Sequence, residues 1–205
     1  QEVEAVDELN LVLTFRDPLP EELKAGDILE NKSWNTSEYL VRNCVFRNHR
    51  ARNLVIKTPG RVVVKHNEFA SMMPAILIRT DMSFWYESGA VDDVLIAENR
   101  FGDCVTGGGR FGVISIANSR EERFADEPMH RNIRIENNFF RTFDTNILDA
   151  EYVDGLVFRG NRIERSGTYE PISPERAVLI LKHNRNMTIE ANTCDGKTEF
   201  SQEIE

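Results

Sequence analysis

The sequence predicts an all-β fold, a right-handed single-stranded parallel β-helix of about five to six coils. Three observations predict it. A short phrase occurs six times: two apolar residues two positions apart, an asparagine, and another apolar residue. A run rich in Ile, Val and Leu follows all but the last phrase, as buried parallel strands require. The phrases return at an uneven spacing whose short values define a bare coil, so the longer spacings indicate loops inserted into a solenoid.

The phrase itself explains how one coil forms. Alternation with a period of two places Val62 and Val64 on one face of a strand and Val63 on the other. Asparagine marks a bend, because its side chain bonds local backbone and tolerates left-handed dihedrals. Stacked coils would align the asparagines in a ladder in which each amide donates to one neighbour and accepts from the other. The first copy is imperfect, since Glu38 stands at its first apolar position. The six copies are Leu40/Asn43/Val45, Val62/Val64/Asn67/Phe69, Val94/Ile96/Asn99/Phe101, Ile133/Ile135/Asn138/Phe140, Leu156/Phe158/Asn161/Ile163 and Met187/Ile189/Asn192/Cys194.

A second strand follows in each coil, at residues 54–58, 75–80, 112–118, 146–151 and 177–182. A period of two predicts that these strands share one inward face, made of Leu54/Ile56, Ile76/Ile78, Ile114/Ile116 and Val178/Ile180. Asp149 falls at an inward position in this register. A carboxylate there must bond backbone at a turn, or else the register shifts and Asp149 faces a groove.

Three segments divide the chain. Residues 1–37 do not follow the phrase, and we expect the end of an antiparallel β element there. Residues 38–194 form the β-helix, and residues 195–205 form a short acidic tail that we expect to fray. An open coil end at residue 38 exposes strand edges. We therefore expect a second copy of the chain, in a homo-oligomer, or an upstream part of the same protein to cover it.

Composition excludes several classes of partner. The net charge of −9 and the sequence pI near 5.1 argue against nucleic acid or an anionic membrane surface as a partner. No run approaches the ~18 apolar residues of a membrane span. The three cysteines read as small buried hydrophobes, and the four histidines show no spacing typical of a metal site. We therefore expect no metal and no other cofactor. The cysteines are Cys44, Cys104 and Cys194, and the histidines are His49, His66, His130 and His183.

The insertions indicate where a ligand binds, because the loops that rim the lateral face of a solenoid carry its specificity. Residues 81–92 and 118–131 leave the same corner on consecutive coils, so we expect the two loops to be neighbours. Residues 102–111 leave the other corner, where residues 166–175 should lie two coils further on.

The insertion Asp81-Met82-Ser83-Phe84-Trp85-Tyr86-Glu87-Ser88-Gly89 is the most distinctive. Three adjacent aromatic residues in a polar loop are unusual on a surface. An aromatic ring offers a flat apolar face to a sugar, so Trp85 and Tyr86 are candidates for substrate binding. Neighbouring carboxylates can bond hydroxyls or move protons, which makes Glu87 and Asp81 the catalytic candidates. The alternatives are that Phe84 and Tyr86 anchor the loop to the coil and that Asp81 caps the loop.

Cations adjoin this loop. Lys57 and Arg79 stack on adjacent coils and point outward, and Arg52 lies just upstream. Such a cluster on an acidic protein can clamp hydroxyls or a carboxylated sugar. The alternative is a solvated face whose cations pair with nearby acids.

The order of these pieces resembles the exo-acting α-1,3-galactosidases of glycoside hydrolase family 110. The resemblance rests on Gly26-Asp27-Ile28-Leu29-Glu30-Asn31, Trp34-Asn35, Arg42-Asn43, Arg50-Ala51-Arg52, Met72-Met73-Pro74-Ala75-Ile76-Leu77-Ile78 and Phe84-Trp85-Tyr86-Glu87-Ser88-Gly89-Ala90-Val91. It covers residues 9–105; beyond them only the general phrase of pectate-lyase-like solenoids continues.

The resemblance implies an inverting, metal-independent hydrolase that removes terminal α-linked galactose from an oligosaccharide or glycan. It also implies an extracytoplasmic location, periplasmic or secreted. In similar proteins an earlier coil carries an adjacent pair of aspartates before an inserted β element. The resemblance therefore implies that this chain is a C-terminal part whose catalytic carboxylates lie outside it, with Asp81 and Glu87 as the candidates within it.

Two other functions remain open from the sequence. In a polysaccharide lyase, Lys57 or Arg79 would abstract a proton beside a uronate. In a non-catalytic carbohydrate-binding or structural solenoid, the same loop would bind sugar without turnover.

Overall fold

The computed structural model describes residues 2–31, 33, 38–82, 85, 87, 89–118, 128–195 and 200–205. The chain divides into two compact units, Gln1–Glu30 and Asn31–Glu205. Within the described residues the regular elements are strands, and no helix there is long and apolar enough to cross a membrane.

The first unit contains one antiparallel hairpin. Strand β1 (Glu2–Ala5) pairs with β2 (Leu11–Thr14), so that Glu2 lies opposite Thr14. The carboxylate of Asp7 shapes the turn by accepting hydrogen bonds from the backbone N–H groups of Leu9 and Asn10, at 2.8 and 2.9 Å. Both strands are exposed along their whole length.

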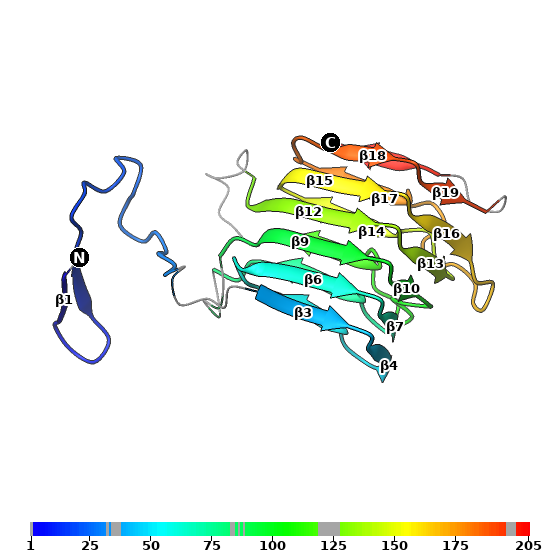
Figure 1. Cartoon of the computed structure of the whole chain (residues 1–205), viewed down its shortest axis with the longest axis horizontal. Helices are drawn as coiled ribbons and strands as arrows, with labels where there is room; N and C mark the ends of the chain where they lie inside the picture. The colour runs from blue at the N-terminus through cyan, green and yellow to red at the C-terminus, as the bar shows by residue number, and fades with distance from the viewer. Residues whose placement is uncertain are drawn as a thin grey trace. The chain divides into compact units, whose positions relative to one another are not determined.

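The second unit is a right-handed parallel β-helix, as the sequence predicts (Figure 1). Each coil contributes one strand to each of three parallel, six-stranded sheets. The first sheet contains β3 (Glu38–Arg42), β6 (Arg61–Lys65), β9 (Asp92–Ala97), β12 (His130–Glu136), β15 (Val153–Arg159) and β18 (Thr188–Glu190). The second sheet contains β4 (Val45–His49), β7 (Glu68–Ser71), β10 (Arg100–Phe101), β13 (Phe139–Thr142), β16 (Arg162–Arg165) and β19 (Thr193–Cys194). The third sheet contains β5 (Leu54–Ile56), β8 (Ile76–Arg79), β11 (Ile114–Ala117), β14 (Leu148–Glu151), β17 (Leu179–Lys182) and β20 (Gln202–Ile204).

The sequence does not predict two parts of this architecture, the second sheet and strand β20. The strands of the second sheet are as short as the two residues of β10, so in the sequence they look like the end of the phrase. Strand β20 lies in the acidic tail and pairs in parallel with β17, with Leu179 opposite Gln202. The expectation that the tail frays is therefore wrong for its last residues, which complete the third sheet.

A ladder of five asparagines runs through the bend between the first and second sheets, and the first four of them are buried. Asn99 is typical: its Nδ2 donates to Asn138 Oδ1 at 3.1 Å and to the backbone oxygen of Val64 at 2.9 Å. The Asn99 backbone N–H donates to the same Asn138 oxygen at 3.0 Å. Each amide thus satisfies polar groups of both adjacent coils, which confirms the predicted ladder. Its members are Asn67, Asn99, Asn138, Asn161 and Asn192.

The first coil corrects the predicted register. The left-handed residue is the one before each ladder position, and Asn43, with a φ of 55°, is such a residue. Cys44 occupies the ladder position, where its N–H donates to Asn67 Oδ1 at 3.0 Å. Tyr39 and Val41 are the inward pair, opposite Val62 and Val64, so Glu38 is not a defect in the phrase. The residues directly before the other ladder positions have φ values of 57° (His66), 54° (Glu98), 54° (Asn137), 64° (Gly160) and 53° (Ala191).

The cysteines are all free thiols, but they differ in environment. Cys44 is exposed, so the prediction of a buried hydrophobe is wrong at this position. Cys104 is buried, and burial raises the pKa of its thiol to about 12. Cys194 is partly buried, and burial also raises its pKa. Cys104 therefore behaves as the small core residue that the sequence predicts.

The core is continuous along the solenoid. Next to the ladder, inward phenylalanines stack coil upon coil, with ring centroids 5.1 Å apart for Phe46 and Phe69, 5.0 Å for Phe69 and Phe101, and 4.6 Å for Phe101 and Phe140. These separations match the spacing of neighbouring strands, ~4.8 Å. The aromatic stack thus repeats the strand spacing inside the core.

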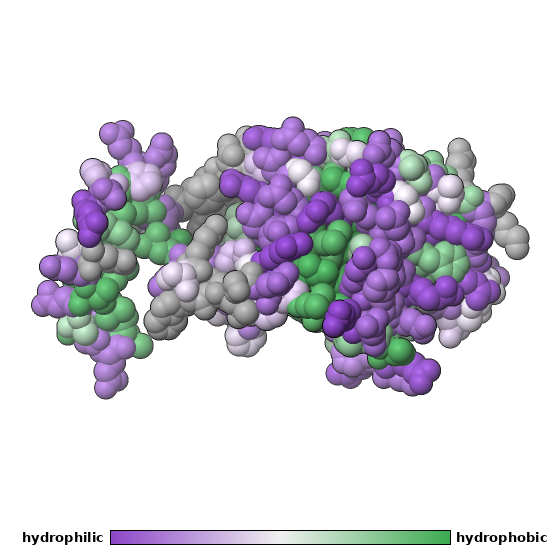
Figure 2. Space-filling model, in the orientation of Figure 1, coloured by the Kyte–Doolittle hydropathy of each residue, from purple (hydrophilic) through white to green (hydrophobic). Residues whose placement is uncertain are grey.

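The outer faces of the sheets differ in polarity. Figure 2 shows an apolar strip over β3, β6 and β9, bordered by hydrophilic side chains. The outward residues at the middle of these strands are Leu40, Val63 and Leu95, which lie opposite one another.

The ladder generates a stability prediction. Replacing Asn138 by alanine leaves the oxygen of Ile96 and the N–H of Asn99 buried without their partner. We expect the free energy of unfolding to fall by about 3 kcal/mol, because each unsatisfied buried group costs about 1–3 kcal/mol. Urea unfolding monitored by circular dichroism measures this. The control is Asn31→Ala, at an exposed asparagine outside the ladder, which should change stability by less than about 0.5 kcal/mol. An equal effect of the two substitutions would contradict the ladder's role.

Candidate functional site

The predicted site lies on the outer face of the third sheet. Lys57 follows β5 directly, and Arg79 ends β8, which pairs with β5 through Ile56 and Ile78. The two cations therefore lie one strand spacing apart, about 4.8 Å along the solenoid. Val55 and Leu77 form the neighbouring outward column and lie opposite each other.

A hollow of about 510 Å³ opens beside these columns. It brings together six of the seven side chains that the sequence proposes for the site. Tyr86, the seventh, lies outside the described residues, as does Phe84. The lining residues are Arg52, Val55, Lys57, Leu77, Arg79, Asp81, Trp85 and Glu87.

One ammonium group links the two candidate carboxylates. Lys57 Nζ lies 3.3 Å from Asp81 Oδ2 and also contacts Glu87 Oε2. The Lys57 and Asp81 side chains are mostly buried, at 21% and 14% exposed, whereas Glu87 is 54% exposed. Glu87 is thus the carboxylate that an incoming molecule can reach.

Asp81 organises the insertion. Its Oδ1 accepts a hydrogen bond from the Trp85 N–H at 3.1 Å, and its backbone oxygen accepts one from the Glu87 N–H at 3.0 Å. Both carboxylate oxygens are therefore engaged, one with the loop backbone and one with Lys57. The loop-capping alternative for Asp81 describes these contacts, and the cap leaves the Trp85 side chain 68% exposed.

The arginines of the hollow are available to a ligand. Arg79 is exposed and Arg52 is half-buried. Within the described part of the chain, neither guanidinium forms an ion pair, whereas Lys57 is shared between two acids. The alternative of a solvated face with paired cations therefore describes Lys57 but not the arginines. Their N–H groups can donate to sugar hydroxyls.

Val55 and Leu77 also line the hollow, and the sequence did not predict them as site residues. They are apolar side chains beside the charged column, and their period-two offset from Lys57 and Arg79 is the signal that could have placed them in the hollow.

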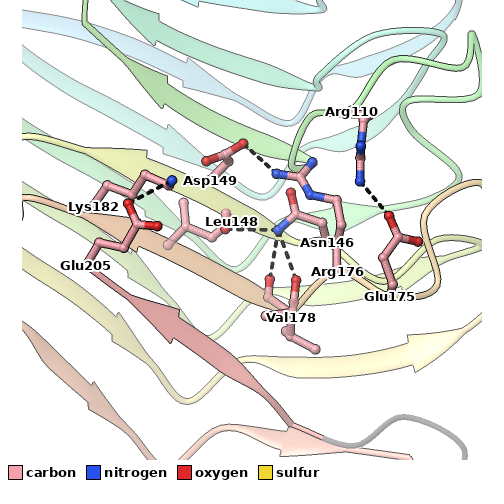
Figure 3. Close-up of polar contacts among 10 residues, drawn as sticks. Arg110, Asn146, Leu148, Asp149, Glu175, Arg176, Val178, Lys182 and Glu205 are labelled. Atoms are coloured by element: carbon pink, nitrogen blue, oxygen red, sulfur yellow. Dashed lines mark hydrogen bonds and ion pairs between the residues drawn. The ribbon is translucent and has the colours of Figure 1, made fainter.

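Asp149 does not face the core. Its strand pairs Leu148 with Ile114 and Ala150 with Ile116, so the predicted inward register is wrong by one residue. In the next coil Leu179 and Leu181 face inward, so the prediction that Val178 and Ile180 form the inward pair is also wrong. Asp149 points outward and accepts from Arg176 at 3.1 Å (Figure 3). Of the second alternative for this residue, the shifted register is therefore correct.

The long loops meet where the sequence places them. Thr80 Oγ1 donates to Asn118 Oδ1 at 3.1 Å, and the Arg131 N–H donates to the oxygen of Val91 at 3.0 Å. The two ends of residues 81–92 and 118–131 are therefore neighbours; residues 119–127 lie outside the described part. At the other corner, Arg110 pairs with Glu175 at 2.5 Å (Figure 3), which joins residues 102–111 to residues 166–175 as predicted.

His130 holds the base of the first pair of loops. Its Nδ1 accepts from the Val91 N–H at 3.3 Å, and its Nε2 lies 3.2 Å from the oxygen of Ala117. The side chain is buried, and burial lowers its pKa to about 4. The histidine is therefore neutral at physiological pH and bonds both loops at once. As for metals, no group of three His, Cys, Asp or Glu side chains among the described residues could hold an ion.

A parallel β-helix that carries such a hollow on its side has the architecture with which solenoids bind extended ligands. Comparison with known proteins shows which proteins the chain is similar to. The chain is 39% identical over 196 residues to α-1,3-galactosidase B of Bacteroides thetaiotaomicron, covering 94% of the chain and 32% of that protein. It is 38% identical over 201 residues to α-1,3-galactosidase A of Bacteroides fragilis, covering 97% of the chain and 33% of that protein. It is 32% identical over 184 residues to α-1,3-galactosidase A of Shewanella woodyi, covering 90% of the chain and 30% of that protein.

These similarities confirm the resemblance found in the sequence, since the three relatives are named α-1,3-galactosidases. It spans about a third of the length of the curated relatives it matches. No protein-family model matches it.

The position of His130 generates a pH prediction. Its pKa in the folded state, about 4, lies below the ordinary value of 6.5, so the neutral form stabilises the fold. This contribution is fully present above pH ~6.5 and is lost as the pH falls through the folded pKa. At pH ~4 the loss amounts to about 3 kcal/mol. Urea unfolding across this range should show a weaker pH dependence for His130→Gln than for the unchanged protein. An identical pH dependence of the two proteins would contradict it.

Proposed function

We propose that this chain forms the galactose-binding side of a glycoside hydrolase that removes terminal α-1,3-linked galactose from oligosaccharides or glycans. One observation carries the proposal: the six described site candidates line a single hollow in a chain that is 39% identical to a protein named α-1,3-galactosidase. The part of the longer protein that lies outside this chain is included in the proposal as the source of further catalytic groups.

The sugar would bind between an aromatic platform and arginine donors. Trp85 offers an exposed ring, and the C–H faces of a pyranose pack on such a ring. Arg52 and Arg79, which form no ion pair within the described residues, would donate to the hydroxyls. Tyr86 remains part of the proposed platform.

The two carboxylates would have different roles. Inversion requires an acid and a base on opposite sides of the bond, ~6.5–9.5 Å apart. Glu87 is exposed to the hollow and is held by Lys57, so we assign it to the reacting side as one of these two groups. Asp81, with both oxygens engaged, positions Trp85 and Lys57. The other reacting carboxylate would come from outside the chain.

The contacts of Lys57 weigh against a polysaccharide lyase. A lysine base must be free to accept a proton, but the Lys57 ammonium lies between two carboxylates. The names of the relatives also favour a galactosidase.

The proposal includes location and assembly. We place the protein outside the cytoplasm, periplasmic or secreted, on the family resemblance alone; cell fractionation tests this. The edge strands β3, β4 and β5 would be covered by a second copy of the chain or by an upstream part of the same protein.

The platform generates the first activity prediction. Trp85→Ala in the complete enzyme should lower kcat/KM for a terminal α-1,3-galactoside by about tenfold to a hundredfold, a loss of ~1–3 kcal/mol of stacking. Release of galactose from a defined trisaccharide is the measurement. Tyr169→Ala removes another exposed aromatic ring, from the loop after β16, and should leave kcat/KM unchanged. If Trp85→Ala also left it unchanged, the hollow would not be the sugar site.

The carboxylates generate a second prediction. Glu87→Gln should lower kcat by about a hundredfold or more, as loss of a general acid or base does. Asp81→Asn should instead act mainly on KM, because it loosens the loop that presents Trp85. It should also lower the melting temperature, which Glu87→Gln should not. Full kcat in Glu87→Gln would remove this residue from the reaction. A complete protein that binds galactosides but releases no galactose would instead favour a sugar-binding solenoid without turnover.

A further inference from the structure

A second hollow, of about 270 Å³, lies on the outer face of the second sheet, away from the columns that form the proposed galactose site. Two small residues make it. Phe69 pairs with Phe101, so the next outward residues, Ala70 and Gly102, lie side by side on neighbouring strands. A Cβ atom built on Gly102 would lie 3.9 Å from the Ala70 Cβ, which shows how closely the two positions meet. The outer face is therefore hollow at this point because both side chains are short.

Three arginines surround this hollow: Arg47 on β4, Arg100 on β10 and Arg141 on β13. Each is exposed, and within the described part of the chain none forms an ion pair. Other arginines of the solenoid do find acids: Arg134 lies 2.9 Å from Asp93, and Arg176 lies 3.1 Å from Asp149. In a chain of net charge −9, three such guanidinium groups around one depression are unusual.

Phe139 holds Arg100 in place. The Arg100 guanidinium lies over the Phe139 ring at 5.0 Å from its centroid, and Arg162 lies over the same ring at 5.4 Å. Register places Phe139 between these two arginines, with Arg100 on one neighbouring strand and Arg162 on the other. Arg162 contacts Glu164, whereas Arg100 forms no ion pair among the described residues, although Glu68 lies opposite it on β7. Arg100 is thus oriented by a cation–π contact while its N–H groups stay free for a ligand.

The remaining wall supplies groups that bond hydroxyls. Asp103 Oδ1 accepts from Ser166 Oγ at 2.7 Å, and the Thr168 N–H donates to the same hydroxyl at 3.2 Å. This contact closes the hollow on the side of residues 166–175. Glu68 is the other acid in the lining. Three guanidinium groups against two carboxylates leave the hollow with a net positive charge.

We propose that this second hollow binds an acidic sugar of a glycan, through a carboxylate or a sulfate group. Guanidinium groups bind both anions in a bidentate manner, and Asp103, Glu68 and the Thr168 hydroxyl bond the neighbouring hydroxyls. The presence of acceptors beside the arginines favours a saccharide over an acidic peptide, which has few hydroxyls to offer them. The volume lies just below the ~300 Å³ at which pockets for drug-sized ligands begin, and so suits a short saccharide. The site would bind glycan apart from the galactose site, and it does not depend on the proposed hydrolysis.

Isothermal titration calorimetry of the whole chain tests this. The probes are a galacturonate disaccharide, a sulfated galactose disaccharide and a neutral galactose disaccharide, each at low and at physiological ionic strength. We expect binding of the two acidic probes, or of one of them, which would identify the anion. Binding should weaken as salt rises, because exposed charges are screened. The proposed galactose site would itself bind neutral galactosides, so the deciding titrations use the Trp85→Ala chain. Failure of both acidic probes to bind this variant, or equal binding of the neutral one, would overturn the proposal.

Variants locate the binding. Arg100→Gln and Arg141→Gln should each weaken acidic-probe binding by about tenfold, the loss of one charge-assisted contact. Ala70→Leu should abolish it by filling the hollow without removing a charge. The matched control is Arg131→Gln, at an exposed arginine on the outer face of the first sheet, which should bind as the unchanged chain does. Trp85→Ala should also leave this binding intact, which separates it from the galactose site. Undiminished binding in Ala70→Leu would place the acidic sugar elsewhere and overturn the assignment.

Discussion

The asparagine ladder fixes the position of every other part of the solenoid. At each bend between the first and second sheets, backbone groups leave the strand ladder while still buried, and a buried polar group without a partner is costly. The Asn99 side chain satisfies two of them, the oxygen of Val64 and the N–H of Asn67, and it also accepts from the Asn67 side chain. Since each amide is bonded to the next, the coils are held at one strand spacing whatever lies between them in sequence. Consecutive ladder residues are separated by as few as 23 and as many as 39 positions. The coil can therefore tolerate long insertions, because the closure entropy of a loop grows only slowly with its length.

The geometry of the proposed galactose site follows from this constraint. Lys57 and Arg79 lie one coil apart because β5 and β8 are in register, and the insertion after Arg79 starts where the insertion after Ala117 also starts. Thr80 and Asn118 bond across that corner, and His130 bonds both loops from below. A neutral histidine suits this place, because a buried imidazolium would need a partner that the two backbone groups do not provide. The loop that carries Trp85 is thus anchored at its base by the coil and shaped at its start by Asp81.

The sequence predicts the fold because the phrase is a physical requirement at each bend, and it predicts the residues of the hollow because they follow from strand ends and insertions. The errors have an equally physical cause. In the first coil Cys44 replaces the ladder asparagine, and Asn43 stands one position earlier, where any residue that tolerates a positive φ can stand. When the first coil is aligned on Asn43, the predicted register of its first strand is therefore shifted by one residue. Residues 177–181 are all apolar, so alternation carries no information there, and only pairing with Leu148 and Ala150 reveals that Leu179 and Leu181 face inward. The contacts within the Trp85 loop could not be predicted either, because they depend on which backbone groups reach one carboxylate.

The outer faces explain why two hollows with different chemistry can coexist on one small solenoid. Inward positions must be apolar in every coil, but outward positions form columns in which each coil contributes one independent residue at one strand spacing. On the third sheet, the column of Lys57 and Arg79 lies beside the acids of an insertion. Lys57 pairs with Asp81 and Glu87, whereas Arg79 forms no ion pair among the described residues and can bind a ligand. On the second sheet, the column of Ala70 and Gly102 leaves a depression between Arg47 and Arg141. Glu68 and Asp103 also line it, but within the described residues these arginines form no ion pair. An exposed ion pair contributes little to stability, so pairing these arginines would gain the fold little. Their freedom is better explained by an anion that binds between them than by a structural role.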